Sequence, residues 1–84
     1  YWLEAMDNYT KIHTQQKTYT IKLFLKDALA KLPADKFVRI HRSYAVALEH
    51  ITMLEEDTLY IGSTGLPVGG QYVAEVAGIV KAMN

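Results

Sequence analysis

The sequence predicts a small domain of the mainly β class with small helices, and two observations support this prediction. Apolar and polar residues alternate in several short runs, which turn-forming residues separate. Only two stretches space their apolar residues three and four positions apart, as one face of a helix does. We therefore expect short antiparallel strands, one internal helix at about 24–32 and a C-terminal helix at about 71–82.

A β-hairpin is expected near the start of the chain. The opening residues lean apolar, and Asp7-Asn8 is a turn signal. Residues 9–14 then alternate, and a polar loop leads to a second strand at 18–23. Alternation places Tyr19 on the apolar face of that strand, so core packing is its expected role.

The internal helix is recognised by an apolar stripe at positions i, i+3, i+4 and i+7. Its members are Leu25, Ala28, Leu29 and Leu32. Pro33 disfavours helical backbone in the residue before it, so the helix should stop there. Phe24 stands where a capping Ser, Thr or Asp is expected, which leaves the start of the helix less well marked.

The second half of the chain predicts a meander of short strands and then the terminal helix. Strands are expected at 51–55, 58–62 and 66–68, joined by turns. Gly69 and Gly70 break this pattern. Helical spacing returns afterwards, with an expected buried stripe at Val73, Val76, Ala77 and Val80.

Charge is distributed unevenly, although the formal net charge is zero. Residues 1–44 carry eight Lys and Arg against four Asp and Glu, whereas residues 45–84 carry one Lys against five acids. A partner that prefers the first half can therefore be polyanionic. The chain has no cysteine and no long uncharged apolar run, so we expect a cytoplasmic location without membrane contact.

Catalytic and metal-binding chemistry find little support in the sequence. His13, His41 and His50 lie far apart, and the motifs of a nucleophile elbow, a zinc-protease helix and a phosphate-binding loop are absent. Glu49 beside His50 does not form a recognised ligand spacing with His41. We therefore expect no enzyme, no cofactor and no metal site.

The segment FVRIHRSYAV, residues 37–46, mixes hydrophobic residues with cationic ones. Simple alternation places Phe37, Arg39 and His41 on one side of an extended strand. One interpretation is an edge strand that uses its charges against aggregation. The other is a segment anchored in the core, whose turning end presents Arg39, His41, Arg42 and Ser43 to an acidic partner, because guanidinium and hydroxyl groups suit phosphates and base edges.

Five segments in this order resemble the LytTR DNA-binding domain, the effector module at the C-terminus of many bacterial response regulators. They are WLEAMDNYTKIHT (2–14), LKDALAKLP (25–33), FVRIHRSYAV (37–46), HITMLEEDTLYI (50–61) and LPVGGQYVAEV (66–76). The resemblance covers nearly the whole chain. It implies a single LytTR-like domain over residues 1–84, with a fold of short antiparallel strands and small helices, that binds double-stranded DNA through loops inserted in its grooves.

The resemblance also implies which residues contact DNA. The first loop would supply Asn8, Tyr9 and Lys11, the second His41, Arg42 and Ser43, and the third Gly69, Gly70 and Gln71. We expect phosphate contacts from Lys11, Arg39, His41 and Ser43. We expect Asn8, Tyr9, Arg42 and Gln71 to face bases.

Two departures from the family pattern leave an alternative open. The third loop of the family usually carries Ser with Arg or Lys, where this chain has Gly-Gly-Gln, so a protein–protein interaction or dimerisation module with weakened DNA binding is the second hypothesis. Family domains also begin with a strand or two before the segment that matches Tyr1. We therefore expect a fragment of a longer regulator that lacks its first strand. The resemblance also implies that the domain binds paired DNA sites as a homodimer. It further implies an input from a sensor kinase through a receiver domain outside this chain.

Overall fold

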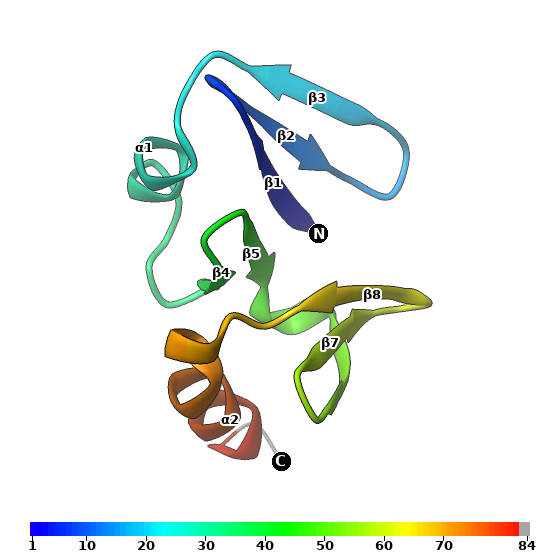
Figure 1. Cartoon of the computed structure of the whole chain (residues 1–84). Coiled ribbons are helices and arrows are strands. Elements are labelled where there is room, and N and C mark those ends of the chain that lie inside the picture. Colours follow the sequence, from blue (N-terminus) through cyan, green and yellow to red (C-terminus); the bar gives the residue numbers. More distant parts are fainter. Residues whose placement is uncertain (83–84) are drawn as a thin grey trace.

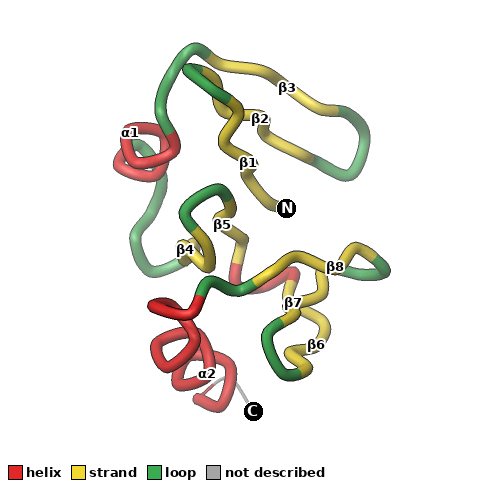
Figure 2. Tube along the Cα trace, in the orientation of Figure 1, coloured by secondary structure: helices red, strands yellow, loops and turns green. Residues whose placement is uncertain are grey.

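The computed structural model describes residues 1–82, and within them the chain forms two antiparallel sheets and two α-helices (Figures 1 and 2). The strands are β1 (Trp2–Met6), β2 (Tyr9–His13), β3 (Thr18–Ile21), β4 (Phe37–His41), β5 (Tyr44–Ala47), β6 (Ile51–Glu55), β7 (Thr58–Ile61) and β8 (Thr64–Pro67). The helices are α1 (Leu25–Ala30) and α2 (Val73–Ala82), and single 3₁₀ turns occupy Leu48–His50 and Gly70–Tyr72. The predicted fold class is confirmed.

The larger sheet has the strand order β3-β2-β1-β5-β4, and the smaller one has the order β6-β7-β8. The β1 strand is central because it pairs with β2 through a two-residue turn and with β5 from much later in the chain. Figure 1 shows α1 beside the larger sheet, with the smaller sheet and α2 gathered at the other end of the molecule.

Two hydrophobic clusters hold these layers together. The main cluster joins Val38, Ile40 and Val46 of the larger sheet to the smaller sheet and to Val76 of α2. The second cluster packs α1 against Leu3 and Ala45 on the other face of the larger sheet. The larger sheet is therefore covered on both faces at its β5–β4 side.

The internal helix has the predicted buried stripe but ends earlier than predicted. Leu25 and Ala28 are buried, while Leu29 and Leu32 pack at the edge of the same cluster. The last helical residue is Ala30, because the N–H groups of Lys31 and Leu32 already bond three residues back, to Ala28 and Leu29. Pro33 then prevents Leu32 from continuing the helix.

Segment 37–46 is a hairpin, and its first strand does not follow simple alternation. Arg39 pairs with Ala45, but the next pair joins His41 to Tyr44, so a β-bulge separates Arg39 from His41. Because Ala45 and Tyr44 point to opposite faces, the bulge turns His41 away from the face that Arg39 occupies. The expectation that these two residues share one side was wrong for this reason.

Two further side-chain predictions need correction. Tyr19 is 48% exposed, because β3 is an edge strand, and the ammonium of Lys17 lies 4.9 Å from the centre of its ring. In α2, Val76 is buried, but Val73 is 37% exposed and Ala77 is also exposed. Val80 packs against the core as predicted, and Tyr72 and Ile79 take the places of the two exposed residues, since Tyr72 enters the core from the 3₁₀ turn that precedes the helix.

The last strand also begins two residues earlier than predicted, at Thr64. The turn before it needs only Gly62 and Ser63, since Gly62 takes the left-handed conformation with a φ of 62°. The β7 and β8 strands therefore form a tight hairpin. After the end of β8, the chain returns through Val68 and Gly69 towards β4.

Candidate nucleic-acid interface

The turn between β1 and β2 and the turn between β4 and β5 lie at the same end of the larger sheet. Antiparallel pairing of β1 with β5 sets Glu4 opposite Tyr44. The Ala5 N–H then donates to the Ser43 carbonyl at 2.7 Å, beyond the last paired residues. Asn8 is exposed in the first turn and Arg42 in the second. Two of the three loops expected to contact DNA are therefore neighbours.

The segment that follows β8 joins this end of the sheet through the backbone of β4. The Gly69 N–H donates to the Ile40 carbonyl at 2.8 Å. A Cβ on Gly69 would lie 3.1 Å from Cδ2 of Tyr72 and 3.6 Å from Cδ2 of His41, so a glycine allows this close approach. The third loop is thus fixed beside the second.

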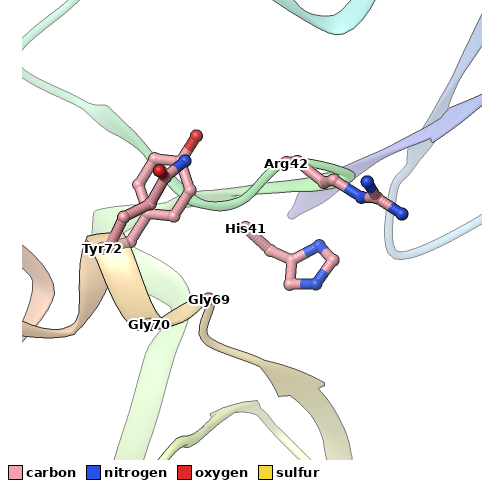
Figure 3. Close-up of a pocket in the computed structure, with 6 residues that line it drawn as sticks. His41, Arg42, Gly69, Gly70 and Tyr72 are labelled. Atoms are coloured by element: carbon pink, nitrogen blue, oxygen red, sulfur yellow. The ribbon is translucent and has the colours of Figure 1, made fainter.

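The second and third loops share one hollow of about 270 Å³. It is lined by His41, Arg42, Gly69, Gly70, Gln71 and Tyr72. Figure 3 shows the side chains of His41 and Arg42 extending from the end of β4 and its turn away from Tyr72, which lies in the 3₁₀ turn before α2. The hollow therefore offers a cation, an imidazole, an amide and an open backbone.

The β4–β5 turn is held by side chains of its own strand. The Arg39 guanidinium donates from Nη2 to the Arg42 carbonyl at 2.6 Å and from Nε to the His41 carbonyl at 3.3 Å. The Ser43 N–H donates to Nδ1 of His41 at 3.0 Å. In residues 1–82 the structure gives the Arg42 guanidinium no hydrogen bond or ion pair, so this exposed cation is available to a ligand.

The remaining expected residues lie on β2, farther from the hollow. Tyr9 is 45% exposed at the start of the strand, next to the first turn. Lys11 lies two residues further on and pairs across the sheet with Glu4. The Glu4 carboxylate accepts a hydrogen bond from His13 at 3.1 Å, so Lys11 sits beside an acid that already has a partner.

Tyr44 and Tyr72 were not among the expected site residues, although both border the site. The ring of Tyr44 lies 5.5 Å from the His41 ring and 6.0 Å from Trp2, measured between centroids. Tyr72 lines the hollow and also packs on the main cluster. Local patterning could not show that Tyr72 lines a hollow, because the pairing that creates the hollow is long-range.

Metal binding and membrane insertion are two other roles on which the described residues bear. No group of three or more His, Cys, Asp or Glu is arranged to hold a metal ion within residues 1–82. Over that range, neither helix is long and apolar enough to cross a membrane. The edge formed by the three loops is the candidate site, because it brings together the exposed Arg42 guanidinium, the His41 imidazole and the Gln71 amide.

Comparison with known families identifies the family of the chain. The family model described as the LytTr DNA-binding domain matches residues 1–81. The chain belongs to the LytTR family of DNA-binding domains. It is consequently a DNA-binding module of bacterial transcriptional regulators and not an enzyme.

Individual relatives agree with this assignment to the LytTR family. The CO-responsive transcriptional regulator RcoM of Rhodospirillum rubrum is 33% identical over 94% of this chain, and the match spans 36% of its own length. The transcriptional regulatory protein YpdB of Escherichia coli K12 is 33% identical over 66% of this chain and 22% of its own length. The chain thus spans well under half of either relative.

The fold of a solved LytTR domain is also similar. A LytTr DNA-binding domain from Bacillus cereus superposes with a TM-score of 0.81 at 29% sequence identity, covering 94% of this chain and 78% of the other. The arrangement of two sheets and two small helices is therefore the LytTR fold, and the three loops described above are placed by that fold.

Proposed function

We propose that this LytTR domain binds double-stranded DNA in a sequence-specific manner through the edge formed by its three loops. The observation that carries the proposal is the convergence of these loops through two backbone hydrogen bonds, Ala5 to Ser43 at 2.7 Å and Gly69 to Ile40 at 2.8 Å. Loops fixed to one another in this way keep a constant spacing. A constant spacing is what contacts to the grooves of a rigid duplex require.

Within this proposal the side chains divide between phosphates and bases. Lys11, Arg39, His41 and Ser43 contact phosphates, and Asn8, Tyr9, Arg42 and Gln71 face bases. The unbonded guanidinium of Arg42 suits a guanine, which presents two acceptors in the major groove. Gln71 suits an adenine in the same way, and Gly70 allows the backbone of the third loop to approach the duplex closely.

The wider setting in this proposal is a cytoplasmic bacterial regulator that binds repeated half-sites as a homodimer. The names of two relatives, both transcriptional regulators, support this setting. A receiver domain outside this chain, addressed by a sensor kinase, would supply the input. Analytical ultracentrifugation of the chain with duplexes of one and two half-sites tests the homodimer directly.

Selection of bound duplexes from a random pool is the experiment that tests specific binding. An enriched motif supports the proposal, and a pool without enrichment contradicts it. Four to six phosphate contacts predict that log K falls with log salt concentration at a slope of about −4 to −5. An affinity that does not change with salt would contradict phosphate binding.

Arg42→Ala is the first substitution to test against the selected motif. Loss of a guanidinium that reads a base should cost about 1–3 kcal/mol on the preferred duplex and much less on unrelated duplexes. Lys81→Ala, in the last turn of α2, is the matched control because it also removes one exposed cation. Equal losses on every duplex would make Arg42 a phosphate contact instead.

The second candidate is an interaction module, and two observations favour it. The third loop carries no charge, since its residues are Gly69, Gly70 and Gln71. The β3 strand (Thr18–Ile21) is an exposed edge of the larger sheet, where a second chain could add a strand. A dimer in solution that resists salt, together with a selection that yields no motif, would favour this candidate over DNA binding.

A further inference from the structure

The hydrogen bonds of His41 fix which of its two ring nitrogens carries a hydrogen. A backbone N–H can only donate, and the Ser43 N–H points at Nδ1 at 3.0 Å. Nδ1 must therefore be unprotonated, so the neutral ring carries its hydrogen on Nε2. This tautomer closes the β4–β5 turn with Nδ1 and leaves the Nε2–H as a donor.

The groups that surround the His41 ring include two guanidinium side chains and two tyrosines. Arg39 lies on the same strand with its guanidinium bonded to the His41 carbonyl, and Arg42 follows directly in the turn. Tyr44 of β5 and Tyr72 before α2 are the titratable groups that face the ring from the other packed elements. Among the described residues, those lining the hollow include no carboxylate, so the lining offers the Nε2–H no acidic acceptor and leaves it to a ligand.

We propose that His41 acts in DNA binding as a neutral positioning residue, whose Nδ1 holds the Arg42-Ser43 turn in the conformation that meets the duplex. The inference rests on the DNA-binding function proposed above and deepens it. The Nε2–H can still donate to a phosphate, but without a positive charge. His41 is thus a neutral donor and a support for the turn, and not a cationic contact.

The inference predicts the sign of the pH dependence. A histidine that binds phosphate as a cation would strengthen DNA binding as the pH falls. Here, protonation of Nδ1 removes the acceptor of the Ser43 N–H and loosens the turn that carries Arg42. We therefore expect DNA affinity to fall on acidification, by roughly three- to tenfold for the loss of one such hydrogen bond.

Two substitutions separate the two ring nitrogens. Asparagine places its side-chain oxygen near the position of Nδ1, so His41→Asn keeps an acceptor for Ser43 and cannot titrate. Glutamine places its amide NH₂ near Nε2, so His41→Gln keeps the donor but loses the acceptor. We expect His41→Gln to bind roughly three- to tenfold more weakly than the parent, and His41→Asn to bind more tightly than His41→Gln and to lack the loss of affinity on acidification.

His50→Gln is the matched control, because His50 lies outside the hollow and its pairing with Glu49 is long, at 3.8 Å. This variant should keep both the affinity and the pH profile of the parent. The probe is the duplex enriched in the selection, held at constant salt and measured by fluorescence anisotropy. A parent whose affinity rises on acidification, or a His41→Gln that binds better than His41→Asn, would overturn the inference.

Nuclear magnetic resonance of the free chain tests the same inference without DNA. The ¹⁵N shifts of His41 should show a pyridine-like Nδ1 and a protonated Nε2, and the Ser43 amide should shift as the ring titrates. The opposite tautomer would overturn the inference even if the substituted chains failed to fold. The expected tautomer in a chain that enriches no duplex would instead count against the proposed function alone, so the two failures are distinguishable.

Discussion

Two turns of the same length carry opposite charge in this domain. Arg42-Ser43 joins β4 to β5, and Glu56-Asp57 joins β6 to β7. The first is braced by three hydrogen bonds from Arg39 and to His41, side chains of its own hairpin. The second is stabilised through its backbone, since the Asp57 carbonyl accepts the Val68 N–H at 2.7 Å, although Glu56 holds a left-handed φ of 55° that favours glycine.

The difference in how the two turns are held indicates a different role for each. Side chains that brace the cationic turn restrict its motion, so Arg42 reaches solvent from a fixed base. The acidic turn carries charge that repels a polyanion, and it lies on the half of the chain with the negative excess. The acidic turn should therefore tolerate change, whereas the cationic turn should lose DNA binding when its braces are removed.

The largest expected effect comes from the scaffold that both turns share. Ile40 is completely buried between the two sheets, and its carbonyl accepts the Gly69 N–H. Ile40→Ala should lower the free energy of unfolding by about 2–5 kcal/mol, because it leaves a cavity in the main cluster. Urea denaturation followed by circular dichroism measures this loss.

Val38→Ala in the same cluster is the matched comparison for Ile40. It removes a smaller side chain from the same strand and should cost less. A loss below about 1 kcal/mol for Ile40→Ala would show that the sheets are not joined at this point. The two turns would then not be held by one shared core, and their difference would need another structural explanation.

Removal of the brace at Arg39 should come next in size. Arg39→Ala deletes the donors to the His41 and Arg42 carbonyls, so DNA affinity should fall by about 1–3 kcal/mol on the selected duplex. Arg39→Lys keeps the charge but cannot span two carbonyls with a rigid fork, so it should recover less than half of that loss. Anisotropy titrations at several salt concentrations compare the two variants.

The lysine variant is the decisive one for Arg39. If lysine restores full affinity, the charge alone counts and the brace has no role in binding. If the salt slope of Arg39→Lys equals that of the parent while the affinity stays low, the hydrogen bonds to the turn are responsible. Among the bonds described above, no side chain braces the acidic turn. Substitutions next to that turn should therefore leave the DNA affinity unchanged.

Local patterning predicted much of this fold, because the strands and the α1 stripe depend on residues close in sequence. The pairing of β1 with β5 could not be predicted in that way, although it brings Ala5 to Ser43 and thereby unites two loops. The bulge between Arg39 and His41 could not be predicted either, since nothing in the local sequence marks it. The resemblance to LytTR domains supplied the candidate loops, while the brace and the tautomer of His41 required coordinates.

The smallest expected effect sharpens the comparison from the acidic side. Glu56 holds a left-handed backbone conformation that suits glycine, so Glu56→Gly should raise the free energy of unfolding by about 0.5–1 kcal/mol. Gly62→Ala is the reverse test, because Gly62 has a φ of 62° and open space where a Cβ would stand, and it should cost about 1 kcal/mol.

Neither change should alter affinity for the selected duplex by more than about twofold, since neither turn contributes to the edge that holds Arg42. Glu55→Gln, measured in parallel, accounts for the loss of one negative charge without a change of backbone conformation. A Glu56→Gly chain that binds the duplex much more weakly would mean that the acidic turn takes part in binding, and the contrast between the two turns would fail.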